Sequence, residues 1–212
     1  MSRIISCEVR GSYVSVFQPR RNQLNPDEDP KYSVQLLIPK TAEGKAFLKD
    51  LRSAYGDAIG DRWPKGAPSN VREFMGDERM KPCVRDGDKK ENDAGEPVGG
   101  EYAGHWYLNA SNKKRPGVVE DSTRKPPMSE EDFQSGDYCY VQLSVYGYSM
   151  LGNNGVGFGL QNVLITRKGE PLTGHDSPDA AFKAIPKGAN AVSFSDSNDD
   201  DPLGGGEEDP LA

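Results

Sequence analysis

Hydrophobic and polar residues alternate along several stretches of this chain, and a period of two residues is typical of β-strands. The clearest stretches are DYCYVQLSVYGYSM at 137–150 and VGFGLQNVLITRKG at 156–169. Between them, Asn153, Asn154 and Gly155 favour a tight hairpin turn. The same alternation predicts further strands at residues 3–17, 31–38 and 101–111.

A helical period appears mainly in one stretch of the chain. Residues 42–59 carry apolar side chains at helical spacing, and Thr41 before them suits an N-cap. A shorter helical piece is expected around residues 179–185. Because strands and helices do not alternate, the pattern predicts a mainly β fold. We expect a small five-stranded antiparallel Greek-key barrel with one or two helices and long loops, among them a flexible hairpin or excursion at 86–100.

The strand at 137–150 places four tyrosines on one face, because side chains alternate across a strand. They are Tyr138, Tyr140, Tyr146 and Tyr148, and the opposite face is apolar, as expected of a core face. Single-stranded bases stack on exposed aromatic rings, at ~1–3 kcal/mol per base. Tyrosines are also ordinary cross-strand partners in a sheet. Four of them on one face favour a binding platform.

Three other aromatic residues are candidates for the same platform. Trp106 and Tyr107 lie on the strand at 101–111, and Phe158 lies on the last strand. Trp106 shares its face with Leu108 and Ala110. The sequence therefore leaves open whether Trp106 stacks on a base or belongs to the core.

Basic residues that could hold phosphates follow the strand at 101–111. Lys113, Lys114 and Arg115 form a basic turn, and Arg21 is a further candidate. Grooves that bind single-stranded nucleic acids combine such cations with an aromatic floor. Each of these residues would also be an ordinary solvated surface charge.

No catalytic motif accompanies these residues. The sequence has neither a phosphate-binding GxxxxGK[ST] loop nor a GxSxG nucleophile elbow. Its two histidines and three widely spaced cysteines form neither a zinc pattern nor a disulfide framework. The acid-rich stretches at 86–93 and 130–132 fit solvated loops better than metal ligands. We therefore expect a protein that is not an enzyme and that uses no metal or cofactor.

The chain also lacks the signals of a membrane or secreted protein. No apolar run approaches the ~18–20 residues that span a bilayer, and the N-terminus lacks the apolar core of a signal peptide. We expect a cytoplasmic protein without a membrane partner.

Residues 195–212 carry the whole net charge of the chain. Removing their seven acids from the total of 33 leaves 26, which equals the 26 Lys and Arg residues. An acidic segment broken by Gly and Pro buries too little apolar area to fold. The sequence therefore predicts one domain at 1–194 and a disordered tail at 195–212, which serves either as an interaction tail or only to solubilise the protein. The tail acids are Asp196, Asp199, Asp200, Asp201, Glu207, Glu208 and Asp209.

Four segments together resemble a family of bacteriophage single-stranded-DNA-binding proteins, related by fold to the helix-destabilising proteins of short-tailed phages. They are KYSVQLLIPK (31–40), KPCVRDGD (81–88), GHWYLNASNKKRPGVV (104–119) and the stretch 136–172. The resemblance covers most of residues 1–172, and its weight comes from the order and spacing of the segments.

This resemblance implies an OB-fold, sequence-independent binding of single-stranded DNA, and roles in phage DNA replication or recombination. It implies that the basic turn and the aromatic strands face the DNA, and it places a phage protein in the host cytoplasm. The acidic tail would compete with DNA and recruit replication proteins such as a polymerase or a helicase. The tail ends in DPLA, without the aromatic tip typical of bacterial proteins of this kind. The sequence leaves a homodimer open.

Two other classes of function remain at this stage. One is a phage interaction or assembly protein whose tyrosine face contacts protein. The other is a metal-dependent nuclease that uses the loop carboxylates.

Overall fold

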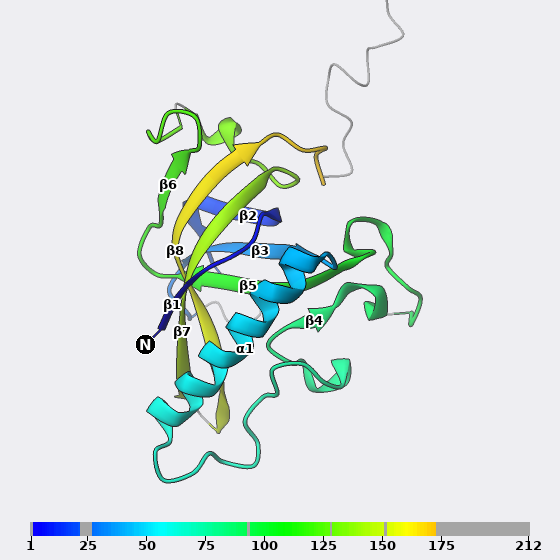
Figure 1. Cartoon of the computed structure of the whole chain (residues 1–212), viewed down its shortest axis with the longest axis vertical. Coiled ribbons are helices and arrows are strands. Elements are labelled where there is room, and N and C mark those ends of the chain that lie inside the picture. The colour runs from blue at the N-terminus through cyan, green and yellow to red at the C-terminus, as the bar shows by residue number, and fades with distance from the viewer. Residues whose placement is uncertain (1, 22–26, 93, 128, 151, 173–212) are drawn as a thin grey trace, which may run out of the picture. The chain divides into compact units, whose positions relative to one another are not determined.

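The computed structural model describes residues 2–21, 27–92, 94–127, 129–150 and 152–172 (Figure 1). These residues belong to one compact unit, Met1–His175. The helical piece expected around 179–185 and the tail at 195–212 lie outside the described residues.

The described part of the chain is built mainly from β-strands, with one α-helix, α1 (Ala42–Arg62). No helix in this part is long and apolar enough to cross a membrane. The strands are β1 (Ser2–Ile5), β2 (Val9–Arg20), β3 (Lys31–Pro39), β4 (Arg85–Asp86), β5 (His105–Asn112), β6 (Gly117–Glu120), β7 (Tyr138–Met150) and β8 (Asn153–Arg167). Short 3-10 helices cover Glu78–Met80, Gly87–Lys89, Gly100–Tyr102 and Glu130–Asp132.

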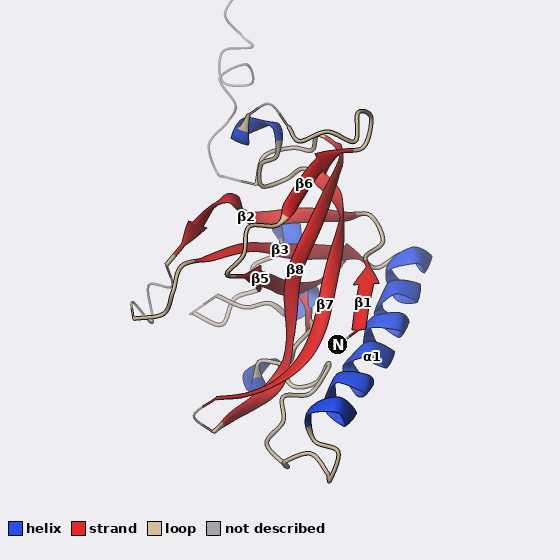
Figure 2. Ribbon diagram, turned by 90° about the vertical axis from the view of Figure 1, so that its left-hand side faces the viewer, coloured by secondary structure: helices blue, strands red, loops and turns tan. Residues whose placement is uncertain are grey.

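Five of these strands close into a barrel in the order β2-β3-β5-β8-β7 and back to β2. Neighbouring strands are antiparallel except β5 and β8, which run parallel where Ser111 pairs with Gly159. In Figure 2 the long strands β7 and β8 cross over β2, β3 and β5. This arrangement confirms the mainly β, OB-type barrel expected for the chain. The parallel pair is the one departure from a fully antiparallel barrel.

The long strand expected at 3–17 is divided into β1 and β2. Both pair with the same edge of β7, but their registers differ by one residue. The change falls at Ser6, whose amide donates to the carbonyl of Val141 at 2.9 Å. The Ser6 hydroxyl accepts from the amide of Val141, also at 2.9 Å. A β-bulge of this kind lets a strand bend around a barrel.

Helix α1 packs against β7 and β1 and covers one side of the barrel (Figure 2). It begins after Thr41, whose hydroxyl accepts from the amide of Gly44 as predicted. The helix buries Phe47, Leu51 and Ala58 on the core. The helix approaches β7 closely at Gly147, which has no side chain. A methyl group there would lie 2.9 Å from the carbonyl oxygen of Ala58.

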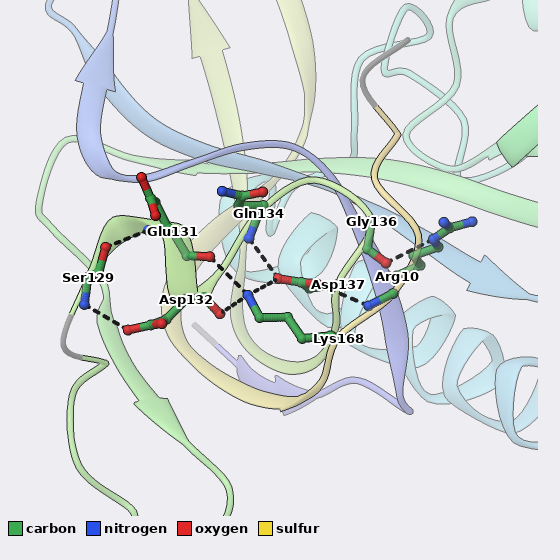
Figure 3. Close-up of polar contacts among 9 residues, drawn as sticks. Arg10, Ser129, Glu131, Asp132, Gln134, Gly136, Asp137 and Lys168 are labelled. Carbon is green, nitrogen blue, oxygen red and sulfur yellow. Dashed lines mark hydrogen bonds and ion pairs between the residues drawn. The ribbon is translucent and has the colours of Figure 1, made fainter. Parts of the chain in front are cut away.

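The chain that follows β8 is tied to the loop that precedes β7 by a network around Asp137 (Figure 3). The Asp137 carboxylate is buried and accepts from the amides of Gln134 and Gly169, at 2.8 and 3.0 Å. The Lys168 ammonium lies 3.1 Å from the same carboxylate and also donates to the carbonyls of Glu131 and Asp132. This network fixes the path of the chain as it leaves the barrel.

One sequence prediction about loops is wrong and another is confirmed. Asn153, Asn154 and Gly155 are paired residues of β8 and do not form the hairpin turn, which contains Gly152 at φ +81°. The excursion at 86–100 is a hairpin, as expected, bridged between Glu91 and Pro97. The segment that follows it packs onto the barrel, where it covers part of the outer face of β5.

Candidate nucleic-acid interface

Two hollows meet on the outer face of β5, where both are lined by Asn109 and Ser111. We call the pair the β5 groove. Its loop half lies beside the β2–β3 connection and is lined by Tyr13, Arg20, Arg21, Lys31, Ser33 and Gln35, among others. Its tyrosine half lies beside the β7–β8 hairpin and is lined by Arg72, Lys81, Cys83, Arg85, Tyr146 and Tyr148, among others. In an OB-fold, the second and third barrel strands, here β3 and β5, form the usual ligand face.

Two of the four predicted platform tyrosines lie in the tyrosine half. Tyr146 pairs across the strands with Gly157, and Tyr148 pairs with Gly155. The end of each ring lies above its glycine. A methyl group on Gly157 would lie 2.9 Å from Cζ of Tyr146, and one on Gly155 would lie 2.8 Å from the hydroxyl of Tyr148. The glycines therefore leave room for both rings to cross from β7 to β8 along the groove floor.

Three cations surround these rings, and no acidic side chain lines this half among the residues described. Arg72 is placed by the bond from its amide to the carbonyl of Asn154, at 3.1 Å. Lys81 ends a 3-10 helix in the left-handed conformation, at φ +50°. The Arg85 guanidinium lies 4.7 Å from the centre of the Tyr107 ring. The tyrosine half thus combines aromatic rings with positive charge, as a phosphate-backbone ligand requires.

The loop half carries mixed charge. Lys31 pairs with Glu28 at 2.6 Å, and Lys113 pairs with Asp29 at 2.7 Å. The hydrogen bond and charge of Lys113, together with the charge of Arg21, hold the pKa of Asp29 below its usual value. Two of the predicted phosphate ligands, Arg21 and Lys113, therefore lie near this half of the groove.

The floor between the two halves is polar and hydrogen-bonded. The buried Tyr102 hydroxyl donates to Oε1 of Gln35 at 2.7 Å, and Nε2 of Gln35 donates to Oδ1 of Asn109 at 2.9 Å. These amides already bond to each other, so they are poorly placed to read base edges. The floor therefore suits a ligand recognised by stacking and charge.

The other two platform tyrosines lie elsewhere. Tyr138 is covered by the guanidinium groups of Arg167 and Arg10, at 3.3 and 5.9 Å from its ring centre. Tyr140 lines a separate hollow beside Thr41 at the start of α1. The four tyrosines share one side of β7 in the alternation. They face different surfaces because this long strand coils around the barrel and its pairing with β8 shifts register after Gln142.

Burial corrects the placement of the remaining aromatic candidates. Tyr107 is 3% exposed and packs with Leu37 and Tyr102 beneath the segment that follows the 86–100 excursion. Phe158 is 5% exposed and packs in the main core, beneath the tyrosine half that it helps to line. Neither ring exposes enough surface for a base to stack on it. Trp106 is half-buried and packs against the core, with the Lys40 ammonium 5.4 Å from its ring centre.

Lys114 and Arg115, the other predicted phosphate ligands, are exposed on the turn between β5 and β6. The amide of Lys114 donates to Oδ1 of Asn112 at 3.0 Å, a bond that shapes this turn. Neither side chain lines the β5 groove.

Two of the loop carboxylates considered as metal ligands, Asp86 and Asp88, have structural partners. The Lys40 ammonium pairs with both Asp86 and Asp88. Asp88 also accepts from the amide of Gly104 at 2.6 Å, and Lys40 and this bond hold the pKa of Asp88 below its usual value. These contacts attach the excursion to the ends of β3 and β5.

Sequence reasoning missed several groove residues. Arg72, Lys81 and Arg85 come from a stretch without periodicity, where charge alone does not separate a ligand-binding cation from a surface one. Tyr13 lies in a predicted strand, and nothing in the sequence gives it a binding role. The signal that points to two of these cations is KPCVRDGD, the segment at 81–88 that carries part of the family resemblance.

The comparisons with known proteins agree with this architecture. A family profile described as the ssDNA-binding protein of Enterobacter phage Enc34 matches residues 2–194. Protein p50 of Acyrthosiphon pisum secondary endosymbiont phage 1 is 32% identical over 168 residues, which cover 78% of this chain and 84% of that protein.

Solved structures of the phage Enc34 single-stranded DNA-binding protein share the fold. The structure in complex with ssDNA has a TM-score of 0.63 at 23% identity and covers 80% of this chain and 89% of its own. A second structure of the same Enc34 protein has a TM-score of 0.61 at 22% identity and covers 85% of this chain and 89% of its own. Together with the profile match, these findings show that this chain belongs to the family of the Enterobacter phage Enc34 ssDNA-binding protein.

Proposed function

We propose that this protein binds single-stranded DNA in the β5 groove without reading its sequence, and that it acts in phage DNA replication or recombination. The observation that carries the proposal is the tyrosine half of the groove. There, Tyr146 and Tyr148 lie among three cations and no acidic side chain of the described residues. The Enc34 relative was solved in complex with ssDNA, which supports the same class of ligand.

In this proposal, successive bases stack on Tyr146 and Tyr148 while Arg72, Lys81 and Arg85 hold the phosphates. The strand continues over Asn109 toward the loop half. Stacking tolerates every base because each base has a π face. Phosphate contacts carry no sequence information. The groove would therefore bind single strands of any sequence and exclude duplex DNA, whose bases are already stacked.

A titration of fluorescent oligo-dT by anisotropy, at several salt concentrations, tests this function. The affinity should fall with a log–log slope of about −0.7 for each phosphate neutralised. Arg72→Ala should weaken binding and make the slope shallower by roughly 0.7. Lys49→Ala, which removes an exposed cation on α1, is the matched control and should change neither quantity. Affinity that does not depend on salt, or a duplex that binds as well as oligo-dT, would contradict the proposal.

The acidic tail at 195–212 is proposed to compete with DNA for the cationic groove and, once displaced, to recruit replication proteins such as a polymerase or a helicase. The support is charge: the tail has seven acids and no base, while residues 1–194 are formally neutral. Deleting 195–212 should tighten oligo-dT binding most at low salt, where screening is weakest. Equal affinities of the full and shortened chains at low salt would restrict the tail to recruitment or solubility.

A further inference from the structure

Tyr13 is a large aromatic residue held in a backbone conformation that such residues rarely adopt. Its φ is +48°, in the left-handed region that favours glycine. It lies in β2 where the pairing with β3 shifts register: Ser12 pairs with Gln35, but Ser15 pairs with Ser33. Two residues of β2, Tyr13 and Val14, therefore stand opposite one residue of β3, which is a β-bulge.

The loop before β7 holds this bulge in place. The amide of Val14 donates to the hydroxyl of Ser135 at 3.0 Å. The amide of Gly11 donates to the carbonyl of Asp137, and the amide of Gly136 donates back to Gly11, at 2.9 and 2.8 Å. The same loop is fixed by the Asp137 network of Figure 3. Strained backbones persist where the surroundings over-determine them, and they cluster at functional sites.

The bulge presents the Tyr13 ring to the loop half of the groove. The side chain lines this hollow and is 63% exposed. Burial, followed by the charge and hydrogen bond of Tyr13, raises the pKa of the Tyr102 hydroxyl at the end of the floor network. The Tyr13 side chain is exposed over most of its surface within the hollow. Fold stability does not explain this arrangement, because a glycine would relieve the backbone strain and an exposed ring buries little area.

A second strained residue lies in the other half of the groove. In the described part of the chain, three residues other than glycine have positive φ, namely Tyr13, Lys81 and Arg124. Two of the three line the β5 groove, one as an aromatic ring and one as a cation. The third, Arg124, pairs with Asp121 at 2.9 Å in the turn after β6.

We infer that Tyr13 is a further base-stacking residue, which holds a nucleotide in the loop half while Tyr146 and Tyr148 hold others in the tyrosine half. The inference rests on the proposed function and specifies it: the strand crosses β5 and contacts aromatic rings on both sides. The strained bulge fixes the ring before DNA arrives, so that little side-chain ordering remains for the binding step.

Two substitutions at this position separate the ring from the backbone. Tyr13→Gly removes the ring and relieves the left-handed strain, so its unfolding midpoint should equal or exceed that of the wild type. Its affinity for oligo-dT should fall by roughly 5- to 150-fold, the loss of one stacked base. Tyr13→Phe keeps the ring and should bind within about twofold of the wild type.

The outcomes distinguish this inference from the proposed function. If Tyr13→Gly binds oligo-dT as the wild type does while Tyr146→Ala binds more weakly, the inference about Tyr13 is wrong and the proposed function stands. If Tyr13→Phe loses as much affinity for oligo-dT as Tyr13→Gly does, the hydroxyl and not the ring contributes to binding. That result also overturns the inference that Tyr13 stacks on a base. If the wild type does not bind oligo-dT, the proposed function itself fails.

Photo-crosslinking gives a direct readout on the full-length protein. An oligo-dT that carries 5-iododeoxyuridine should crosslink to Tyr13 on irradiation, and peptide mass spectrometry would locate the adduct. Tyr140, which is 38% exposed in a separate hollow, is the internal comparison. Adducts on Tyr146 or Tyr140 with none on Tyr13 would overturn the inference.

Discussion

The phenol ring of Tyr146 lies over Gly157 of the paired strand, so closely that a methyl group on Gly157 would stand 2.9 Å from Cζ of the ring. Gly157→Ala should therefore displace the ring from the groove floor without removing it. We expect oligo-dT binding to weaken by about 1 kcal/mol, roughly fivefold in Kd. Anisotropy titration measures this change, and an unchanged Kd would show that the ring position does not matter.

Gly56 provides a matched glycine substitution outside the groove. It is an exposed residue of α1, and a methyl group there would meet no atom within 4 Å. Gly56→Ala should raise the free energy of unfolding by about 0.5–1 kcal/mol, because alanine favours a helix more than glycine does. Urea unfolding measures the gain, and oligo-dT affinity should not change. A loss of stability would contradict the placement of Gly56 on the solvent side of α1.

Removal of the Asp137 carboxylate should destabilise the fold strongly. Asp137→Ala leaves the amides of Gln134 and Gly169 without their acceptor, and we expect a loss of about 3 kcal/mol. Lys168→Met should cost less than Asp137→Ala, because the Lys168 side chain is 61% exposed and the buried carboxylate keeps both of its amide donors. Thermal and urea unfolding of the two variants measure the difference. Equal losses would show that the ion pair, and not the amide bonds, carries the stability.

Thiol modification can report occupation of the groove. Burial raises the pKa of Cys7 to about 11 and raises that of Cys83 as well. Both thiols should thus react slowly with iodoacetamide at neutral pH and faster as the pH rises toward their pKa values. Because Cys83 lines the tyrosine half and Cys7 lines a different hollow, oligo-dT should slow modification of Cys83 alone. Equal rates at Cys83 with and without oligo-dT would place the ligand elsewhere.

The barrel strands could be predicted from the sequence because one face of each is buried. Alternation located β3, β5, β7 and β8 within a few residues, and helical spacing located α1. The hairpin turn was misplaced because local turn preference at Asn153–Gly155 is weaker than the strand pairing of these residues with β7 and residues 70–72. The fold therefore follows largely from period and burial.

The site was only partly predictable. Alternation shows which residues share a side of β7, but it cannot show that the strand coils, which separates Tyr140 from Tyr146. Tyr107 alternates as an exposed residue would, and it is buried because the preceding segment around Tyr102 folds over it. The cations of the tyrosine half lie in a stretch without periodicity, where long-range contacts decide the position.

The closure of the barrel has a consequence for its synthesis. Strands β2, β3 and β5 pair in sequence, and the short β4 pairs with residues 106–107 of β5. The remaining edge of β2 and the rest of that edge of β5 are paired only by β7 and β8, which begin at Tyr138. On the ribosome, a chain that ends before this point has an open sheet whose β2 edge is unpaired and whose β5 edge is covered only in part by β4, and such edges invite association with other chains. Such non-local pairing also slows folding. We therefore expect a pause in translation between β5 and β7 to prolong the exposure of these strand edges and to favour association of nascent chains.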